Sequence, residues 1–226
     1  DPLAYGVFGE PTGLVPIVQH KGIVRWDITV HGRSAHTSRP ELGLNAIVGM
    51  TEVIAELRAH EQTLQDRARS TLLTGPTITV TQIQGGRPRN ATPDECTIAI
   101  DFRVTPGMNP TAERDAVIER LSSLPWSVSH SPVQLMMPSL DTNPDSIVSR
   151  RILEICRDAV APGIQLQGVP FGTDAAWAGQ RCPAIVLGPG DIRFAHAVDE
   201  EIQISELATA VDVYQRIMLE PFAELP

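Results

Sequence analysis

The sequence predicts an α/β fold in which one α/β domain is interrupted by a second domain of different architecture. Two observations support this prediction. Between Ile23 and Gln134 the hydrophobic pattern changes between strand and helix periods in the order β-α-β-β-α-β. A short apolar run precedes this block, and a further α/β pattern follows it. We therefore expect residues 1–19 to form part of the first domain, residues 20–135 the inserted domain, and residues 136–226 the rest of the first domain.

The inserted block has alternating strand patterns and helical spacing in one continuous series. Strands are expected at Ile23–His31, Thr77–Ile83, Cys96–Val104 and Trp126–Gln134, and helices at Leu42–Leu64 and Thr111–Leu124. This order is that of the split βαβ, or ferredoxin-like, arrangement, a four-stranded antiparallel sheet with two helices on one face. Because the pattern is complete, we expect this block to fold autonomously.

The flanking segments predict the interrupted domain. Tyr5–Phe8 reads as a buried strand that ends in a turn, and Ala184–Leu187 reads as a second one. Asn143-Pro144-Asp145 predicts a helix start, because a capping residue is followed by proline at the first helical position. Ser205 is expected to cap the last helix.

Composition excludes several classes of partner. The formal net charge is −9, and Lys21 is the only lysine, so a nucleic-acid partner is not expected. No apolar run approaches the roughly 20 residues that cross a bilayer, so no membrane partner is expected either. The three cysteines, Cys96, Cys156 and Cys182, are far apart and form no CxxC pair. Reduced thiols in a cytoplasmic protein fit this pattern better than disulfides or a thiolate zinc site.

Two residues stand where an α/β fold places its ligands. His196 lies in a loop that follows the buried strand Ala184–Leu187, and Glu10 lies in the turn after Tyr5–Phe8. Taken singly, each is more often an ordinary loop residue than a metal ligand. One histidine and one glutamate also fall short of the three or four ligands that a zinc site needs.

Six segments, taken together and in order, resemble one family. They are Phe8–Thr12, Gly32–Pro40 with Gly43–Ile47, Gly85–Pro93, Asp101–Arg103, Phe171–Ala175 and Gly188–Glu200. Phe8-Gly9-Glu10-Pro11-Thr12 is similar to the Gly-Glu-Pro-Thr motif of the acetylornithine deacetylase and succinyl-diaminopimelate desuccinylase family of zinc metallopeptidases, which are aminoacylase-like hydrolases. The resemblance covers nearly the whole chain. It implies a partial, zinc-peptidase-like catalytic α/β domain, interrupted by a ferredoxin-like lid and dimerisation domain.

The resemblance also implies a role for each matching residue. Glu10 would bind one metal ion and His196 the other, in a site with two zinc ions, where cobalt could replace zinc. Further implied roles are His36 as the group that stabilises the oxyanion, often in the partner subunit's site; Asn90 and Arg103 as substrate-binding residues; and Gly172, Thr173 and Asp174 as the lining of the substrate end of the pocket. The substrate would be a small N-acyl amino acid, and the lid domain would form a homodimer.

Simpler interpretations remain open for the lid residues. His36 could be an ordinary loop histidine, and Asn90 could only shape a turn. Arg103 could face solvent or pair with Asp101.

The chain lacks several groups that the family requires. A His-x-Asp pair, a bridging aspartate and a Glu-Glu pair precede the Gly-Glu-Pro-Thr segment in the family, and none of them is found here. We therefore expect a shortened form, a proteolytic product or a split gene product that is inactive by itself. The function expected for the parent is a metal-dependent removal of an acyl group by a water that two zinc ions activate. The alternatives are a non-catalytic dimerisation or binding module of the same fold, and a zinc-free globular protein whose motifs match by chance.

Overall fold

The structure is a computed structural model that describes residues 4–65, 67, 70–86 and 88–220. Arg87, in the Gly85–Pro93 segment, and Asp1–Leu3, at the start of the first expected domain, lie outside the described residues. The chain divides into two compact units. Unit 1 contains Asp1–Lys21, Thr71–Leu73 and Ser139–Pro226, and unit 2 contains Gly22–Ser70 and Thr74–Pro138.

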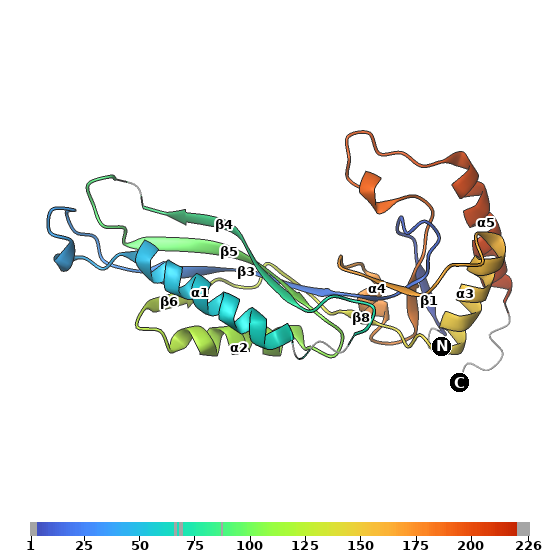
Figure 1. Ribbon diagram of the computed structural model, residues 1–226, viewed down its shortest axis with the longest axis horizontal. Helices are drawn as coiled ribbons and strands as arrows, with labels where there is room; N and C mark the ends of the chain where they lie inside the picture. Colours follow the sequence, from blue (N-terminus) through green and yellow to red (C-terminus); the bar gives the residue numbers. More distant parts are fainter. Residues whose placement is uncertain (1–3, 66, 68–69, 87, 221–226) are drawn as a thin grey trace. The chain divides into compact units, whose positions relative to one another are not determined.

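Unit 2 is an antiparallel sheet with two helices (Figure 1). Its elements are β3 (Gly22–His31), a 3-10 turn (Pro40–Leu42), α1 (Ala46–Gln65), β4 (Thr77–Gly85), β5 (Glu95–Val104), α2 (Pro110–Ser122), β6 (Ser127–His130) and β7 (Leu135–Met137). The strand order is β4-β5-β3-β6, and β7 also pairs with β3. This arrangement confirms the β-α-β-β-α-β order that the sequence predicts.

The helices cover one face of this sheet because the strands are apolar on that face. Along β5 the buried side chains are alternate ones, from Cys96 to Val104, and Phe102 is 0% exposed. Val53 and Leu57 of α1 and Val117 of α2 join the same core. Figure 1 shows both helices on one side of the sheet.

The prediction of one continuous fourth strand over Trp126–Gln134 is wrong, because the structure has two short strands, β6 and β7, in this region. β6 and β7 both pair with β3, but the chain between them leaves the ladder. Pro132 lies in this gap and has no N–H to donate to a ladder. The neighbouring Ser131 and Gln134 keep single backbone hydrogen bonds to Asp27 and Arg25 of β3.

Helix α1 also begins later than the expected Leu42. Asn45 precedes the first helical residue, and its Oδ1 accepts hydrogen bonds from the backbone N–H groups of Ile47 (3.0 Å) and Val48 (3.4 Å). This side chain therefore caps the helix. Leu42 and Leu44 stay outside it and are exposed.

The two ends of unit 2 lie close together. A Cβ atom on Gly22 would stand 2.6 Å from the carbonyl oxygen of Met137 and 2.8 Å from the carbonyl carbon of Pro138. Glycine is required at this position because any side chain would collide with backbone. The chain therefore enters and leaves unit 2 at neighbouring points.

Unit 1 combines a small mixed sheet with helices. Its elements are β1 (Gly6–Phe8), β2 (Ile17–His20), β8 (Leu140–Asp141), α3 (Ile147–Ala159), β9 (Gln167–Val169), α4 (Ala175–Ala178), β10 (Ala184–Val186), a 3-10 turn (Ile192–Phe194) and α5 (Ile204–Leu219). The sheet order is β1-β10-β2-β8, with β9 beside β2 and with β1 parallel to β10. Ile152 of α3, Val213 of α5 and Ile185 of β10 meet in one core.

Two predicted helix caps are corrected. Asn143 does not cap α3, because its Oδ1 accepts from Asp145 N in a local turn (2.9 Å). Ser146 is the cap, and its Oγ accepts from Ser149 N (3.1 Å). Ser205 does not cap α5 either. It lies inside the helix, and Gln203 stands at the cap position with an extended backbone.

Cys96, Cys156 and Cys182 are all free and buried. Within the described part of the chain, no helix has the length and apolar character to cross a membrane.

Candidate functional site

The parallel pair β1 and β10 builds the first part of the candidate site. The register pairs Gly6 with Ala184 and Phe8 with Val186, so both strands end at the same edge of the sheet. The turn that carries Glu10 and the loop that begins at Gly188 therefore follow neighbouring strands. Such edges are where α/β sheets bind their ligands.

Hydrogen bonds lock these two segments together. The carbonyl oxygen of Gly188 accepts from the backbone N–H groups of Thr12 (3.1 Å) and Leu14 (2.9 Å). The Thr12 hydroxyl also accepts from Gly188 N (3.2 Å). A Cβ atom on Gly188 would lie 2.4 Å from the carbonyl oxygen of Glu10. Only glycine allows this approach, which fixes where the Glu10 backbone stands.

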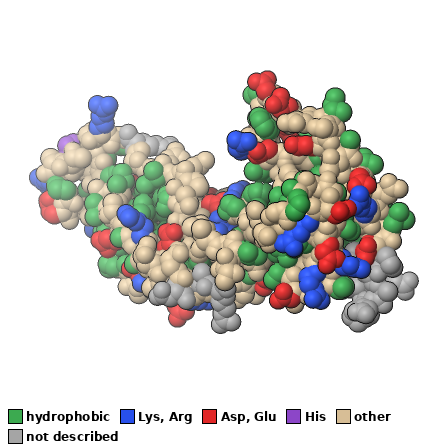
Figure 2. Space-filling view, turned by 45° about the vertical axis from the view of Figure 1, so that its right-hand side comes forward, with side chains coloured by type: hydrophobic (Ala, Val, Ile, Leu, Met, Phe, Trp, Pro, Cys, Tyr) green, Lys and Arg blue, Asp and Glu red, His purple; other side chains and the backbone are tan. Residues whose placement is uncertain are grey.

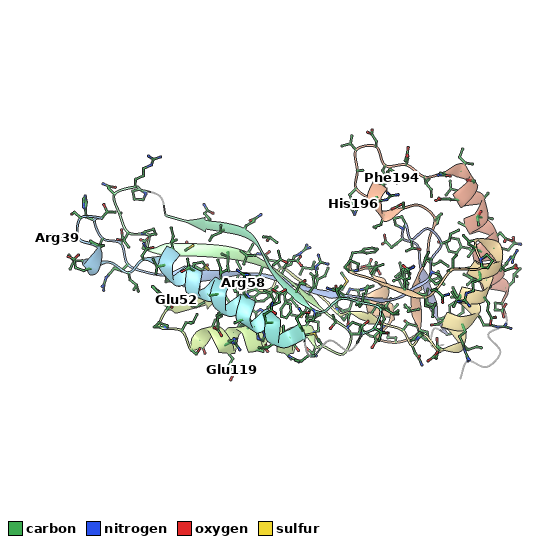
Figure 3. All side chains as sticks on the ribbon, viewed as in Figure 1. Arg39, Glu52, Arg58, Glu119, Phe194 and His196 are labelled. Carbon is green, nitrogen blue, oxygen red and sulfur yellow. The ribbon has the colours of Figure 1, made fainter. Side chains whose placement is uncertain are left out.

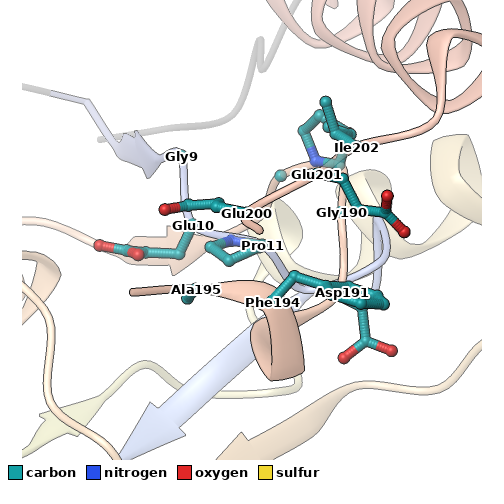
Figure 4. Close-up of a pocket in the computed structure, with 12 residues that line it drawn as sticks. Gly9, Glu10, Pro11, Gly190, Asp191, Phe194, Ala195, Glu200, Glu201 and Ile202 are labelled. Atoms are coloured by element: carbon teal, nitrogen blue, oxygen red, sulfur yellow. The ribbon is translucent and has the colours of Figure 1, made fainter. Parts of the chain in front are cut away.

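An acidic hollow of about 350 Å³ opens at this edge. Its lining includes the carboxylates of Glu10, Asp191, Glu200 and Glu201 beside the apolar Phe194. In Figure 4 the side chains of Glu10 and Glu200 extend to the same side of the close-up. Such a concentration of carboxylate oxygens favours a cation over an anion.

Asp191, which lines the hollow, accepts hydrogen bonds from the exposed Arg193. Arg193 donates to it from both the side-chain Nε (2.8 Å) and the backbone N–H (2.9 Å). These hydrogen bonds hold the pKa of Asp191 below its usual value.

His196 lies directly after this lining, on an exposed loop that Figure 3 shows beside Phe194. Its φ of 61° places it in the left-handed region, where among the described non-glycine residues only Leu14 (φ 58°) joins it. Such a conformation is unfavourable for a residue with a Cβ atom, and strained residues concentrate at functional sites.

The described residues do not complete a metal site. Carboxylate and imidazole are suitable ligand types for zinc, but a catalytic zinc ion takes three protein ligands. Within the ranges that the structure describes, no group of three His, Cys, Asp or Glu side chains could hold a metal ion.

His36 and Asn90 come together in unit 2. His36 forms an isolated bridge with Ala91, and the backbone N–H of Thr37 donates to the carbonyl oxygen of Asn90 (3.0 Å). Nδ1 of His36 accepts from the backbone N–H of Ser38 (3.2 Å). That hydrogen bond requires a lone pair on Nδ1, so the neutral ring carries its hydrogen on Nε2, which is left to donate outward.

Arg103 is not brought to this pair. It faces Ile23, at the start of β3, whereas His36 follows the end of that strand, about 25 Å away at the usual rise of a strand. Nε of Arg103 donates to Asp101 (2.5 Å), and Arg25 donates to the other oxygen of the same carboxylate (2.6 Å). Burial acts to raise the pKa of Asp101, but the hydrogen bonds from both arginines hold it below its usual value.

The predicted substrate-lining turn, Gly172–Asp174, lies in unit 1 just before α4. Thr173 is 6% exposed, so its side chain points inward, whereas Asp174 is exposed. The candidate residues are thus divided: Glu10, His196 and this turn belong to unit 1, and the lid residues belong to unit 2.

Three supporting contacts could not be predicted from the sequence, although Thr12 itself belongs to the Gly-Glu-Pro-Thr segment. Thr12 clamps Gly188, Tyr214 donates from its hydroxyl to the carbonyl oxygen of Leu187 (2.6 Å), and His20 contacts Thr173. Each bond joins residues far apart in the chain, which no local pattern could reveal.

Comparison with known proteins identifies the family. Residues 18–125 match the peptidase dimerisation domain of the M20 family. Over 220 residues the chain is 33% identical to an acetylornithine deacetylase of Vibrio vulnificus, and 30% identical to one of Aliivibrio salmonicida. Each match covers 95% of this chain but 57% of the relative, so the chain spans little more than half of these proteins.

Solved structures share the fold. An aminopeptidase PepT from Bacillus cereus matches with a TM-score of 0.75 at 18% identity, over 94% of this chain and 56% of that one. An M20 family metallo-carboxypeptidase from Sulfolobus solfataricus matches with a TM-score of 0.66 at 17% identity, over 94% of this chain and 61% of that one. The chain therefore contains the peptidase dimerisation domain of the M20 family and corresponds to the C-terminal part of the acetylornithine deacetylases that it matches.

Proposed function

We propose that this chain is the C-terminal part of a zinc-dependent amidohydrolase that removes the acyl group from an N-acyl amino acid. The observation that carries the proposal is the locked pair of turns at the ends of β1 and β10, which sets Glu10 in the acidic hollow beside the loop of His196. The identity to acetylornithine deacetylases supports N-acetylornithine as the first substrate to test. The proposed compartment is the cytoplasm, which the three free thiols support.

In the complete enzyme, Glu10 and His196 each supply one ligand to a centre of two zinc ions. The remaining ligands come from sequence that this chain does not contain. Such a centre supplies an activated water as the nucleophile.

The lid residues act on the substrate. His36 in its Nε2–H form donates a hydrogen bond to the oxyanion that develops on the amide carbonyl in the partner subunit's site, because Arg103 of the same chain lies too far from it to hold the same substrate. Arg103 uses its Nε and Nη2 on Asp101, which leaves Nη1 for a substrate carboxylate. Asn90 adds an amide contact to the substrate, and Gly172, Thr173 and Asp174 line its far end.

Unit 2 forms a homodimer. β4 is the edge strand of its sheet, and Ile83 on this strand is 60% exposed. Ile47 (39%) and Val48 (50%) of α1 are exposed as well. Figure 2 shows hydrophobic side chains at the surface of the unit that contains α1. An uncovered sheet edge beside apolar side chains favours pairing with a second copy.

The proposal is tested with a hybrid in which this chain replaces the matching part of the Vibrio vulnificus relative. We expect less than one tightly held zinc per molecule of the chain alone, and two zinc ions with hydrolysis of N-acetylornithine for the hybrid. Glu10→Ala and His196→Ala each lower the activity of the hybrid more than about 100-fold and reduce its zinc content. Glu41→Ala, at an exposed glutamate of unit 2, is the matched control and leaves both unchanged.

A second candidate is a dimerisation module without catalysis. The absence of a three-ligand cluster among the described residues favours it. A folded hybrid that dimerises and binds zinc, yet cleaves no N-acyl amino acid, would support this candidate over the first.

A further inference from the structure

His20 is a completely buried histidine outside the proposed catalytic groups. It is the last residue of β2 and is 0% exposed. Burial lowers its pKa, so the ring is neutral under ordinary conditions. A neutral imidazole has one donor and one acceptor nitrogen, and its partners decide which is which.

The partners of His20 define its tautomer. The backbone N–H of Thr173 donates to Nε2 (3.2 Å), so this nitrogen must carry the lone pair. Nδ1 therefore carries the hydrogen and donates to the carbonyl oxygen of Lys21 (3.0 Å). Both nitrogens are used within the fold, which leaves neither for a metal ion.

The same contact orients the turn before α4. The Thr173 hydroxyl lies 3.1 Å from Nε2 of His20 and accepts from the backbone N–H of Ala175 (3.3 Å). The Thr173 carbonyl oxygen accepts from the N–H of Ala176 (3.1 Å), which starts the helix. With Thr173 anchored inward by three of its polar groups, the next residue, Asp174, is turned to solvent.

We propose that His20, in its Nδ1–H form, is the positioning residue of the Gly172–Asp174 turn and thereby sets how this turn meets the substrate. The functional half of this inference rests on the proposed amidohydrolase function. The alternative is a core histidine that contributes only to stability. The positioning role requires Nε2 to accept the hydrogen bond from Thr173, whereas the stability role does not.

Two substitutions test the contributions of Nε2 and Nδ1 one at a time. His20→Gln places a side-chain oxygen near the position of Nε2 and can still accept from Thr173. His20→Asn places its amide near Nδ1 and cannot reach Thr173. Both replace the imidazole by an amide of the same chemistry, so each is the control for the other.

The first measurement uses the unmodified chain. In a histidine ¹⁵N correlation spectrum, Nε2 of His20 should appear as the nitrogen without hydrogen. An Nε2–H tautomer would overturn the proposal without any variant. Amide exchange at Thr173 should then be about 100-fold faster in His20→Asn, and within about 10-fold of the wild-type rate in His20→Gln, as expected when one anchoring hydrogen bond opens. Equal exchange in both variants would show a stability role only.

The second measurement uses the hybrid enzyme. His20→Asn should raise KM for N-acetylornithine about 10-fold or more, and His20→Gln should restore it. If the hybrid has no activity, the proposed function fails, while the tautomer and exchange results still decide whether His20 positions the turn. If the hybrid is active and His20→Asn speeds amide exchange at Thr173 but leaves KM unchanged, the inference about His20 is contradicted and the proposed function is not.

Discussion

At the scale of single residues, His60 is a buried group whose burial is not compensated by hydrogen bonds. It lies on α1 and is 8% exposed, and within the described residues neither ring nitrogen has a hydrogen-bond partner. Charged pairs surround it, since Arg67 donates to Glu113 (2.6 and 3.0 Å) and Arg120 pairs with Glu56. Burial, followed by the positive charge of Arg120, lowers the pKa of His60.

This environment predicts the effect of His60→Leu. Above about pH 6.5 the ring is neutral in both states, and an unsatisfied buried polar group costs about 1–3 kcal/mol. Below that pH the unfolded chain binds a proton that the folded chain resists, so stability is lost as the pH falls. In urea titrations, the free energy of unfolding of the variant should exceed that of the wild type by about 1 kcal/mol at pH 8, and by more than that at pH 5. His36→Leu, at an exposed ring, is the control; an equal gain at both pH values would refute the pH argument.

At the scale of elements, the edge formed by β4 and the start of α1 predicts how association is broken. Val48→Lys and Ile83→Lys should each convert a dimer to a monomer in sedimentation velocity, because desolvating a lysine opposes pairing. Thermal stability should change little, since both side chains are exposed. Val160→Lys, at a valine of 40% exposure in unit 1, should leave the dimer intact. A dimer that survives both Val48→Lys and Ile83→Lys would place the interface elsewhere.

The same elements show what a sequence can predict. β3 and β5 could be predicted because one face of each is buried along ten residues, which gives a clear alternation. β8 has two residues and β9 has three, too few to carry any period. Helix starts were misplaced where a neighbouring side chain took the cap, as Ser146 does in place of Asn143. Glu10 could be singled out from its motif, but the glycine contact that fixes its turn appears only in three dimensions.

At the scale of the whole molecule, the two units differ in what they need to fold. Unit 2 has its own core of strands and helices, so residues 20–138 alone should unfold cooperatively and give a dispersed amide spectrum. The segment 20–138 also contains Thr71–Leu73, which belong to unit 1. We expect the loss of their contacts with unit 1 to lower the stability of unit 1 and not that of unit 2. A broad, non-cooperative melt of residues 20–138 would contradict this expectation. Unit 1 expressed without unit 2 should be less stable than the isolated segment 20–138.

The close approach of Gly22 to Met137 and Pro138 has a consequence for how such proteins can change. Chain ends that meet allow a domain to be inserted or removed with little disturbance to its host. The segment from Gly22 to Pro138 can therefore be exchanged between relatives as one cassette. It should also tolerate circular permutation, with its native ends joined and new ends opened at Gly107, whose φ of 85° and empty surroundings mark an accommodating turn.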